Sequence, residues 1–171
     1  MSAEKTYFNN RKSAGRDDYE TPEWVWELFF KHFKNREARV WAPFFCKGKC
    51  AEYIEKHHGK KYVHCDADFF EWVPPLGFDC IIDNPPYSCK KEVFERCLAL
   101  GKPFALYVPL DTLGRCYISK LLNSPELQLL IPYKKTDFIT DYDVNHTTPP
   151  HKTVWFCYKM ELGDGRQIIF E

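Results

Sequence analysis

Short apolar runs rich in β-branched and aromatic residues alternate along this chain with stretches of helical periodicity, and this alternation restricts the fold more than any other feature. Strands separated by helices cannot pair as hairpins, so they predict a mainly parallel sheet with helices on both faces. The closing strands have no helix between them and predict an antiparallel strand at the sheet edge. We therefore expect an α/β, Rossmann-like fold. The expected strands are residues 38–42, 61–65, 78–83, 104–108, 127–131, 153–159 and 166–170.

The segments between these strands predict helices, and the first of them has the clearest start. Thr21 offers a hydroxyl N-cap, Pro22 suits the first helical position, and Glu23 faces the positive end of the helix. Apolar residues follow at helical spacing and give this helix one buried face. The other expected helices are residues 47–58, 91–100 and 112–122.

Length and charge limit the classes of protein that need to be considered. A chain of 171 residues fits one domain, which we place at residues 19–171 behind a polar, flexible arm at residues 1–18. Lys plus Arg number 24 and Asp plus Glu number 24, so no global charge attracts nucleic acid or membrane. No apolar run approaches a membrane span, and the start lacks the apolar stretch of a signal peptide.

Eight cysteines are scattered over the predicted strands and helices. In a chain with a large core this favours reduced thiols and a cytoplasmic location. A metal site is the alternative, but the sequence contains no Cys-x-x-Cys pair, so we assign no metal ligand. The candidate ligands for such a metal site are Cys46, Cys50, His57, His58, His64 and Cys65.

Ligands in an open α/β sheet bind in the crevice beyond the carboxyl ends of the strands. The predicted strands place residues 43–49, 66–70 and 84–88 at such ends. We expect Ala42, Asp66 and Asn84 to share one edge of the sheet, with the first strand at its centre.

The sharpest chemical signal is Asn-Pro-Pro-Tyr, residues 84–87, directly after a buried strand. Pro85 and Pro86 fix their own φ angles and offer no amide donor, so the loop is stiff. The side-chain oxygen of Asn84 and the Pro85 carbonyl would accept both hydrogens of a planar amine, and Tyr87 would stack on the attached base. The alternative is a stiff strand-to-helix turn with a packed tyrosine.

With these residues the chain resembles the amino-methyltransferases of the N6-adenine group, and in its brevity the phage-type DNA N6-adenine methyltransferases. The resemblance covers about residues 19–160 and implies a class I methyltransferase fold, S-adenosylmethionine as cofactor and a DNA or RNA substrate. It implies that Asn84, Pro85, Pro86 and Tyr87 form the catalytic motif. Enzymes acting on RNA or protein glutamine share Asn-Pro-Pro-Tyr, so these substrates stay open. The matching motifs are Thr21-Pro22-Glu23-Trp24, Trp41-Ala42-Pro43 with Gly48, Asp66-Ala67-Asp68-Phe69-Phe70 and Asp83-Asn84-Pro85-Pro86-Tyr87.

The resemblance also implies binding residues. The cofactor would contact Thr21 and Pro22, the loop from Ala42 through Pro43 and Phe44 to Gly48, and Asp68 with Phe69 at its adenine. Asp66 is an alternative for the ribose hydroxyls, and a turn-stabilising role is the alternative for either aspartate. Substrate contacts would come from Tyr87, Ser88, Lys134 and Lys135. Residues 133–151, with Phe138 and Tyr142, lie where relatives have substrate-facing loops, unless they form a plain solvated loop.

The first cofactor loop departs from the family pattern. Ala42 stands where the family has an acid, and bulky residues follow where a further glycine is usual. We therefore expect weak or lost cofactor binding and a gain in Ala42→Glu, smaller if Phe44 or Phe45 fills the pocket. The alternative function is an inactive relative that binds nucleic acid or protein. At this length, target specificity would come from short loops or a partner chain.

Overall fold

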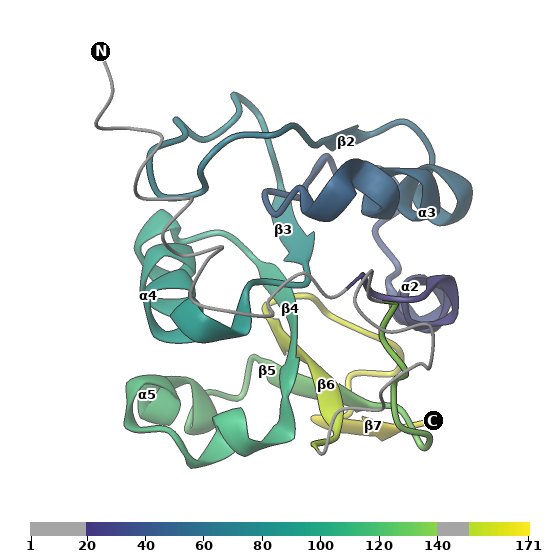
Figure 1. The fold of residues 1–171 in the computed structure, drawn as a ribbon. Helices are drawn as coiled ribbons and strands as arrows, with labels where there is room; N and C mark the ends of the chain where they lie inside the picture. The colour runs from purple at the N-terminus through teal and green to yellow at the C-terminus, as the bar shows by residue number, and fades with distance from the viewer. Residues whose placement is uncertain (1–19, 140–150) are drawn as a thin grey trace.

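Seven strands form one sheet in the order β2-β1-β3-β4-β6-β5-β7 in the computed structural model, which describes residues 20–139 and 151–171 (Figure 1). The pairs β1–β2, β1–β3, β3–β4 and β5–β7 are parallel, and β6 is antiparallel to both β4 and β5. The predicted mainly parallel α/β sheet is thus confirmed. The strands are β1 (Val40–Trp41), β2 (Tyr62–Val63), β3 (Cys80–Asp83), β4 (Phe104–Pro109), β5 (Leu127–Ile131), β6 (Thr153–Tyr158) and β7 (Ile168–Phe170).

Two details of the predicted sheet are wrong. The antiparallel strand β6 lies inside the sheet, between β4 and β5, and the edge strand β7 is parallel to its neighbour. β6 follows β5 without an intervening helix, so it runs back along β5 and fills the space beside β4. β1, expected at the centre, is second from the edge.

Four α-helices and four 3₁₀ turns connect the strands of the described chain. The predicted helix over residues 112–122 is wrong for most of its length, because Arg115 is extended (φ −94°, ψ 135°) and separates two short turns. Gly114, just before it, is a weak helix former. The helices are α2 (Glu23–His32), α3 (Lys49–His58), α4 (Lys90–Leu100) and α5 (Ser119–Leu122), and the 3₁₀ turns are η1 (Cys46–Gly48), η2 (Tyr87–Cys89), η3 (Leu110–Gly114) and η4 (Cys116–Ile118).

Helices cover both faces of the sheet, as predicted. Alternate strand residues face opposite sides, so each strand contributes to two cores. Ala105 and Tyr107 of β4 pack with Phe29 of α2, in the core that also contains α3 residues. Leu106 packs in the other core with Phe94 of α4, beside residues of α5.

Trp155 of β6 anchors helix α2 to the middle of the sheet. Its side chain is fully buried, and its ring meets Trp26 edge-on at 5.4 Å between centroids. Its Nε1 donates a hydrogen bond to the Val25 carbonyl at 3.2 Å. A buried aromatic pair of this kind adds about 0.5–1.5 kcal/mol beyond its area burial, so the start of α2 has a fixed position over the sheet.

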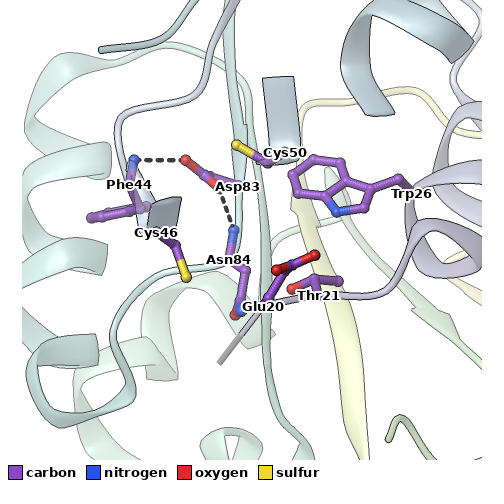
Figure 2. A pocket seen from close by; sticks show the side chains of 8 residues that line it. All are labelled: Glu20, Thr21, Trp26, Phe44, Cys46, Cys50, Asp83 and Asn84. Atoms are coloured by element: carbon purple, nitrogen blue, oxygen red, sulfur yellow. Dashed lines mark hydrogen bonds between the residues drawn. The ribbon is translucent and has the colours of Figure 1, made fainter. Parts of the chain in front are cut away.

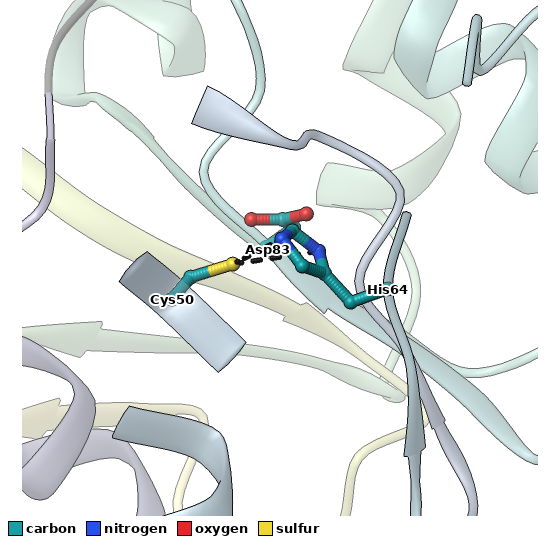
Figure 3. A group of neighbouring side chains, drawn as sticks. All are labelled: Cys50, His64 and Asp83. Carbon is teal, nitrogen blue, oxygen red and sulfur yellow. Dashed lines mark hydrogen bonds between the residues drawn. The ribbon is translucent and has the colours of Figure 1, made fainter. Parts of the chain in front are cut away.

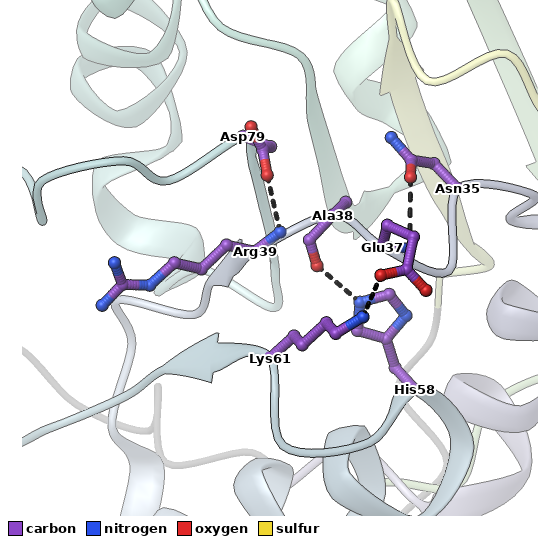
Figure 4. Close-up of polar contacts among 7 residues, drawn as sticks. All are labelled: Asn35, Glu37, Ala38, Arg39, His58, Lys61 and Asp79. Atoms are coloured by element: carbon purple, nitrogen blue, oxygen red, sulfur yellow. Dashed lines mark hydrogen bonds and ion pairs between the residues drawn. The ribbon is translucent and has the colours of Figure 1, made fainter.

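Polar contacts tie the strands together at the amino end of the parallel part of the sheet (Figure 4). The Arg39 amide donates to Asp79 Oδ2 at 2.8 Å, which joins the approach to β1 with the approach to β3. His58, at the end of α3, donates from Nε2 to the Ala38 carbonyl at 2.7 Å and stacks on Phe30. These contacts connect neighbouring elements, and the groups with catalytic potential gather at the other end.

Candidate active site

The carboxyl ends of β1, β2 and β3 meet at one edge of the sheet. β1 pairs in parallel with both neighbours, and the Ala42 amide continues the ladder by donating to the Val63 carbonyl at 2.9 Å. The residues that follow these strands therefore emerge on the same side. The expectation that Ala42, Asp66 and Asn84 share an edge is confirmed.

Asp83, the last residue of β3, joins the first loop to the Asn-Pro-Pro-Tyr loop. Its side chain is 2 % exposed; Oδ2 accepts the Phe44 amide at 2.7 Å and Oδ1 accepts the Asn84 amide at 2.8 Å. Burial raises the pKa of Asp83 to about 8, although the two amides act in the opposite direction. Sequence reasoning gave Asp83 no role of its own, and its only signal was an acid ending an apolar strand.

The Asn-Pro-Pro-Tyr loop leads directly into helix α4. Pro86 is extended (φ −58°, ψ 127°), and its carbonyl accepts the Cys89 amide at 3.4 Å, which closes the turn η2. Asn84 is half-buried and lines a pocket, whereas Pro85 is buried. The loop is therefore a fixed turn that directs the Asn84 side chain toward the pocket (Figure 2).

That pocket contains about 20 Å³ of space, room for a water molecule and far below the roughly 300–1,000 Å³ of usual ligand sites. Two of its buried polar atoms, Thr21 Oγ1 and Trp26 Nε1, have no hydrogen-bond partner in the described part of the chain. Leaving a buried polar group unsatisfied costs about 1–3 kcal/mol, so a polar ligand here would relieve an existing penalty. The lining residues are Glu20, Thr21, Trp26, Phe44, Cys46, Cys50, Asp83 and Asn84.

Glu20 supplies a carboxylate to this pocket, and sequence reasoning missed it. The residue is 8 % exposed, and its backbone forms an isolated antiparallel bridge with Ile139. Its Oε1 accepts a hydrogen bond from Tyr53 at 3.3 Å and lies 3.9 Å from Lys49 Nζ. The only sequence signal was its place directly before Thr21, because the partners come from distant segments.

Ala42 is fully buried in the core beneath α2 and α3, and Pro43 after it is also buried. A glutamate at position 42 would place a carboxylate among apolar side chains, which is strongly unfavourable. The burial of Ala42 therefore argues against the gain in cofactor affinity expected for Ala42→Glu, and the pocket already contains the carboxyl groups of Glu20 and Asp83.

Bulky side chains crowd the first loop, residues 43–48, as predicted. A Cβ on Gly48, which has φ +81°, would lie 3.2 Å from the Phe45 ring, so this position requires glycine. Phe45 in turn stacks on His64 at 5.0 Å, while the Phe44 ring turns away from the pocket (Figure 2). Cys46 has φ +31°, which side-chain-bearing residues rarely adopt. The further glycine that the family resemblance implies would fit at this strained position.

The segment after β2 shows mainly structural contacts. Asp68 Oδ1 accepts the Phe70 amide at 2.8 Å, which is the turn-stabilising alternative considered for this aspartate. Phe69 is 1 % exposed and packs 5.5 Å from Trp41, so it would have to leave the core to meet an adenine. Asp66 is exposed at the bend, and its contact with ribose stays a prediction.

Aromatic and basic side chains gather around Tyr87. Its ring centroid lies 6.2 Å from Phe138 and 6.0 Å from His151, and Lys90 Nζ lies 5.5 Å above it. The pKa of His151 is lowered by burial and, less strongly, by the charges of Lys90 and Lys135, while Asp111 raises it. Lys90 thus lies against the aromatic cluster, and the charge of Lys135 acts on His151.

The remaining expected substrate residues are dispersed. Lys134 lies 4.1 Å over the ring of Trp24, at the start of α2, and Ser88 is exposed in η2. Tyr142 and the expected arm at residues 1–18 fall outside the described residues. Of the two lysines, Lys135 is the one whose charge lowers the pKa of His151.

Three buried hydroxyls hold residues 132–139 over the carboxyl end of the sheet. Thr153 Oγ1 donates to Tyr107 at 2.8 Å and contacts Thr136 Oγ1 at 3.1 Å, and Tyr107 and Thr136 are themselves hydrogen-bonded. This segment then reaches the backbone bridge between Ile139 and Glu20. The hydroxyl cluster therefore helps to position the pocket carboxylate.

No protein-family model matches this chain, and no curated protein matches it. Among the described residues, no helix is long and apolar enough to cross a membrane. All eight cysteines lie in the described ranges, and none forms a disulfide. An activity must therefore be argued from the chemistry of the pocket itself.

Proposed function

We propose that this chain is an S-adenosylmethionine-dependent amino-methyltransferase of the N6-adenine group that acts on nucleic acid, with DNA preferred. One observation carries the proposal: a single pocket contains the Asn84 amide, the Glu20 carboxylate and two buried unsatisfied polar atoms. Asn84 belongs to a motif typical of amine methylation, and the other groups are suited to a charged cofactor. The class I methyltransferase fold is part of this proposal.

The polar groups of the pocket fit the amino-acid end of the cofactor. That end carries an ammonium, for which Glu20 provides a carboxylate, and a carboxylate, for which Thr21 Oγ1 and Trp26 Nε1 provide donors. A pocket of about 20 Å³ does not admit the whole cofactor. Binding therefore requires the pocket to widen, with movement of the first loop, which contributes Phe44 and Cys46 to its wall.

Asn84 would activate and orient the amine. When bound, the cofactor supplies an electrophilic methyl group on a sulfonium. The Asn84 side-chain oxygen and the Pro85 carbonyl accept the two amine hydrogens, which concentrates the lone pair on nitrogen and directs it toward the methyl group. Asp83 holds the Asn84 backbone through the 2.8 Å hydrogen bond, so the amide is oriented before the substrate arrives. The released proton passes to water.

The surroundings of Tyr87 fit a base with its phosphates. Stacking on an aromatic ring contributes about 1–3 kcal/mol per base, and Lys90 and Lys135 would lie near the backbone charges. A base inside a duplex would first have to be flipped out to reach Asn84.

The direct test follows methyl transfer from labelled S-adenosylmethionine to a DNA oligonucleotide, an RNA oligonucleotide and a glutamine-containing peptide. We expect N6-methyladenine in DNA, and Asn84→Ala should lower turnover at least 100-fold with little change in cofactor affinity. Asn123→Ala, an exposed asparagine at the end of α5, is the matched control. Undiminished turnover in Asn84→Ala would leave the motif as a stiff turn only.

A second candidate is an inactive relative that uses the same edge to bind nucleic acid. The observation in its favour is the small size of the pocket, about 20 Å³, which does not admit the cofactor. Calorimetric titration with S-adenosylmethionine separates the two: the methyltransferase binds it, and the inactive relative gives no heat while still retaining an oligonucleotide.

A further inference from the structure

Three metal-binding side chains converge beside the first loop (Figure 3). Cys50 lies on α3, His64 follows β2, and Asp83 ends β3. One donor atom from each lies within 4.8 Å of the other two. Cys50 Sγ is 3.6 Å from both ring nitrogens of His64. Three elements far apart in sequence thus present sulfur, nitrogen and oxygen to one point.

The spacing agrees with a tetrahedral ion. Bonds of about 2.3 Å to sulfur and about 2.1 Å to nitrogen, at the tetrahedral angle, place these two ligands about 3.6 Å apart. The 3.6 Å between Cys50 Sγ and His64 Nε2 matches that value, but Sγ is equally far from Nδ1, so the imidazole ring has to turn to direct the Nε2 lone pair at the ion. The donor atoms lie within 4.8 Å of one another, so any wider separation has to shorten by about 1 Å, within the reach of a side-chain rotation.

Hydrogen bonds already orient two of the ligands. His64 Nδ1 donates to the Ala42 carbonyl at 2.7 Å, which leaves the lone pair of Nε2 for an ion. Each Asp83 oxygen accepts one backbone amide, from Phe44 or Asn84, and keeps a second lone pair. This is the arrangement in which backbone groups fix the direction of metal ligands.

Asp83 also lacks a counter-charge. It is 2 % exposed, yet no ion pair found among residues 20–139 and 151–171 includes it. A buried carboxylate beside a half-buried thiol is unfavourable when both are ionised. A divalent cation between them would remove that penalty.

We propose that Cys50, His64 and Asp83 bind one Zn²⁺ ion. A set of one sulfur, one imidazole and one carboxylate favours zinc over magnesium or calcium, which prefer oxygen alone. Cys50 and Asp83 also line the pocket, whose 20 Å³ accommodates a water molecule as fourth ligand. The ion clamps the start of α3 to the ends of β2 and β3. The site shares the pocket with the proposed cofactor contacts, but zinc binding does not require methyl transfer and can be measured in an active or an inactive protein.

The test measures zinc bound by the purified full-length chain after chelator treatment, titration with zinc chloride and dialysis. Elemental analysis should find one zinc per chain. Loss of an outer-shell partner alone weakens metal affinity about 10–100-fold, so Cys50→Ser and His64→Gln should each weaken it at least about 100-fold. The matched controls Cys65→Ser and His57→Gln alter neighbouring residues outside the cluster and should retain the ion.

Cobalt substitution in the unaltered protein covers the case in which a variant fails to fold. Bound Co²⁺ should show thiolate-to-metal charge transfer and the intense visible bands of tetrahedral coordination. No zinc retained by the unaltered chain together with no such spectrum would overturn the proposal. If Cys50→Ser and His64→Gln retain as much zinc as the unaltered protein, the proposal is overturned as well. Cys50 and His64 would then form only a hydrogen-bonded pair.

Discussion

Glu20→Gln tests whether the carboxylate of the pocket meets the cofactor ammonium. Glutamine keeps the size of the side chain and the backbone bridge to Ile139, and it removes only the charge. A charge-assisted hydrogen bond contributes about 1.5–3 kcal/mol. Lys49 Nζ, 3.9 Å away with its side chain 53 % exposed, forms a weak pair that binding would disrupt. Breaking such a pair costs up to about 1 kcal/mol, which reduces the affinity that the carboxylate adds.

The net loss is therefore about 0.5–3 kcal/mol, or a cofactor affinity about 2- to 140-fold lower at 1.4 kcal/mol per tenfold. Isothermal titration calorimetry with S-adenosylmethionine measures this difference directly. The control is Glu23→Gln, three residues further along and paired with Lys56 outside the pocket, which should leave affinity unchanged.

Two results would refute this reasoning at different levels. If the unaltered chain binds the cofactor and Glu20→Gln binds it equally well, the ammonium lies elsewhere and Glu20 only bridges the backbone. If neither the unaltered chain nor Phe45→Ala, which removes the ring packed against Gly48, binds the cofactor, the proposed methyltransferase activity fails.

Three further predictions concern stability and thiol chemistry. In chelated protein, the pKa of Asp83 is raised to about 8, against about 3.9 unfolded, so the free energy of unfolding should fall from pH 4 to 8 by up to about 1.4 kcal/mol per pH unit. Urea titrations across this pH range should show no such fall in the free energy of unfolding of Asp83→Asn; a pH dependence equal to that of the unaltered protein would contradict the prediction. In the native protein the exposed Cys65 and Cys116 should react first with a thiol reagent, and all eight cysteines should react after unfolding without reductant; a lower total would indicate disulfides. Trp155→Phe should lower the free energy of unfolding by about 1–3 kcal/mol in urea, because the hydrogen bond to Val25 and part of the packing are lost; a change below about 0.5 kcal/mol would contradict this.

The fold was predictable as far as local patterns determine it. Alternating apolar runs and helical stretches indicated the parallel sheet and the two helical layers. The place of β6 was not predictable, because strand order depends on which surfaces pack once the chain has collapsed. The break at Arg115 was missed because the segment keeps apolar residues at helical spacing on both sides of Gly114.

For the candidate site, the sequence revealed only those residues that belong to one continuous motif. Asn84 and Tyr87 stood out because the motif is continuous and follows a strand. Glu20 and Trp26 did not, since an acid before a helix and a tryptophan on its apolar face are common, and only the fold brings them to Asn84. Cys50, with its partners on other elements, has no recognisable metal-ligand spacing.

The interior position of β6 has a consequence for the order in which the protein is made. β4 and β5 leave the ribosome before residues 153–158, and neither pairs with the other, since β6 lies between them. Until that strand emerges, β4 has an open edge and β5 lacks its partner, and open edges pair readily with other chains. A nascent chain that stalls before Thr153 therefore contains the Asn-Pro-Pro-Tyr segment, but its sheet remains divided and prone to aggregation.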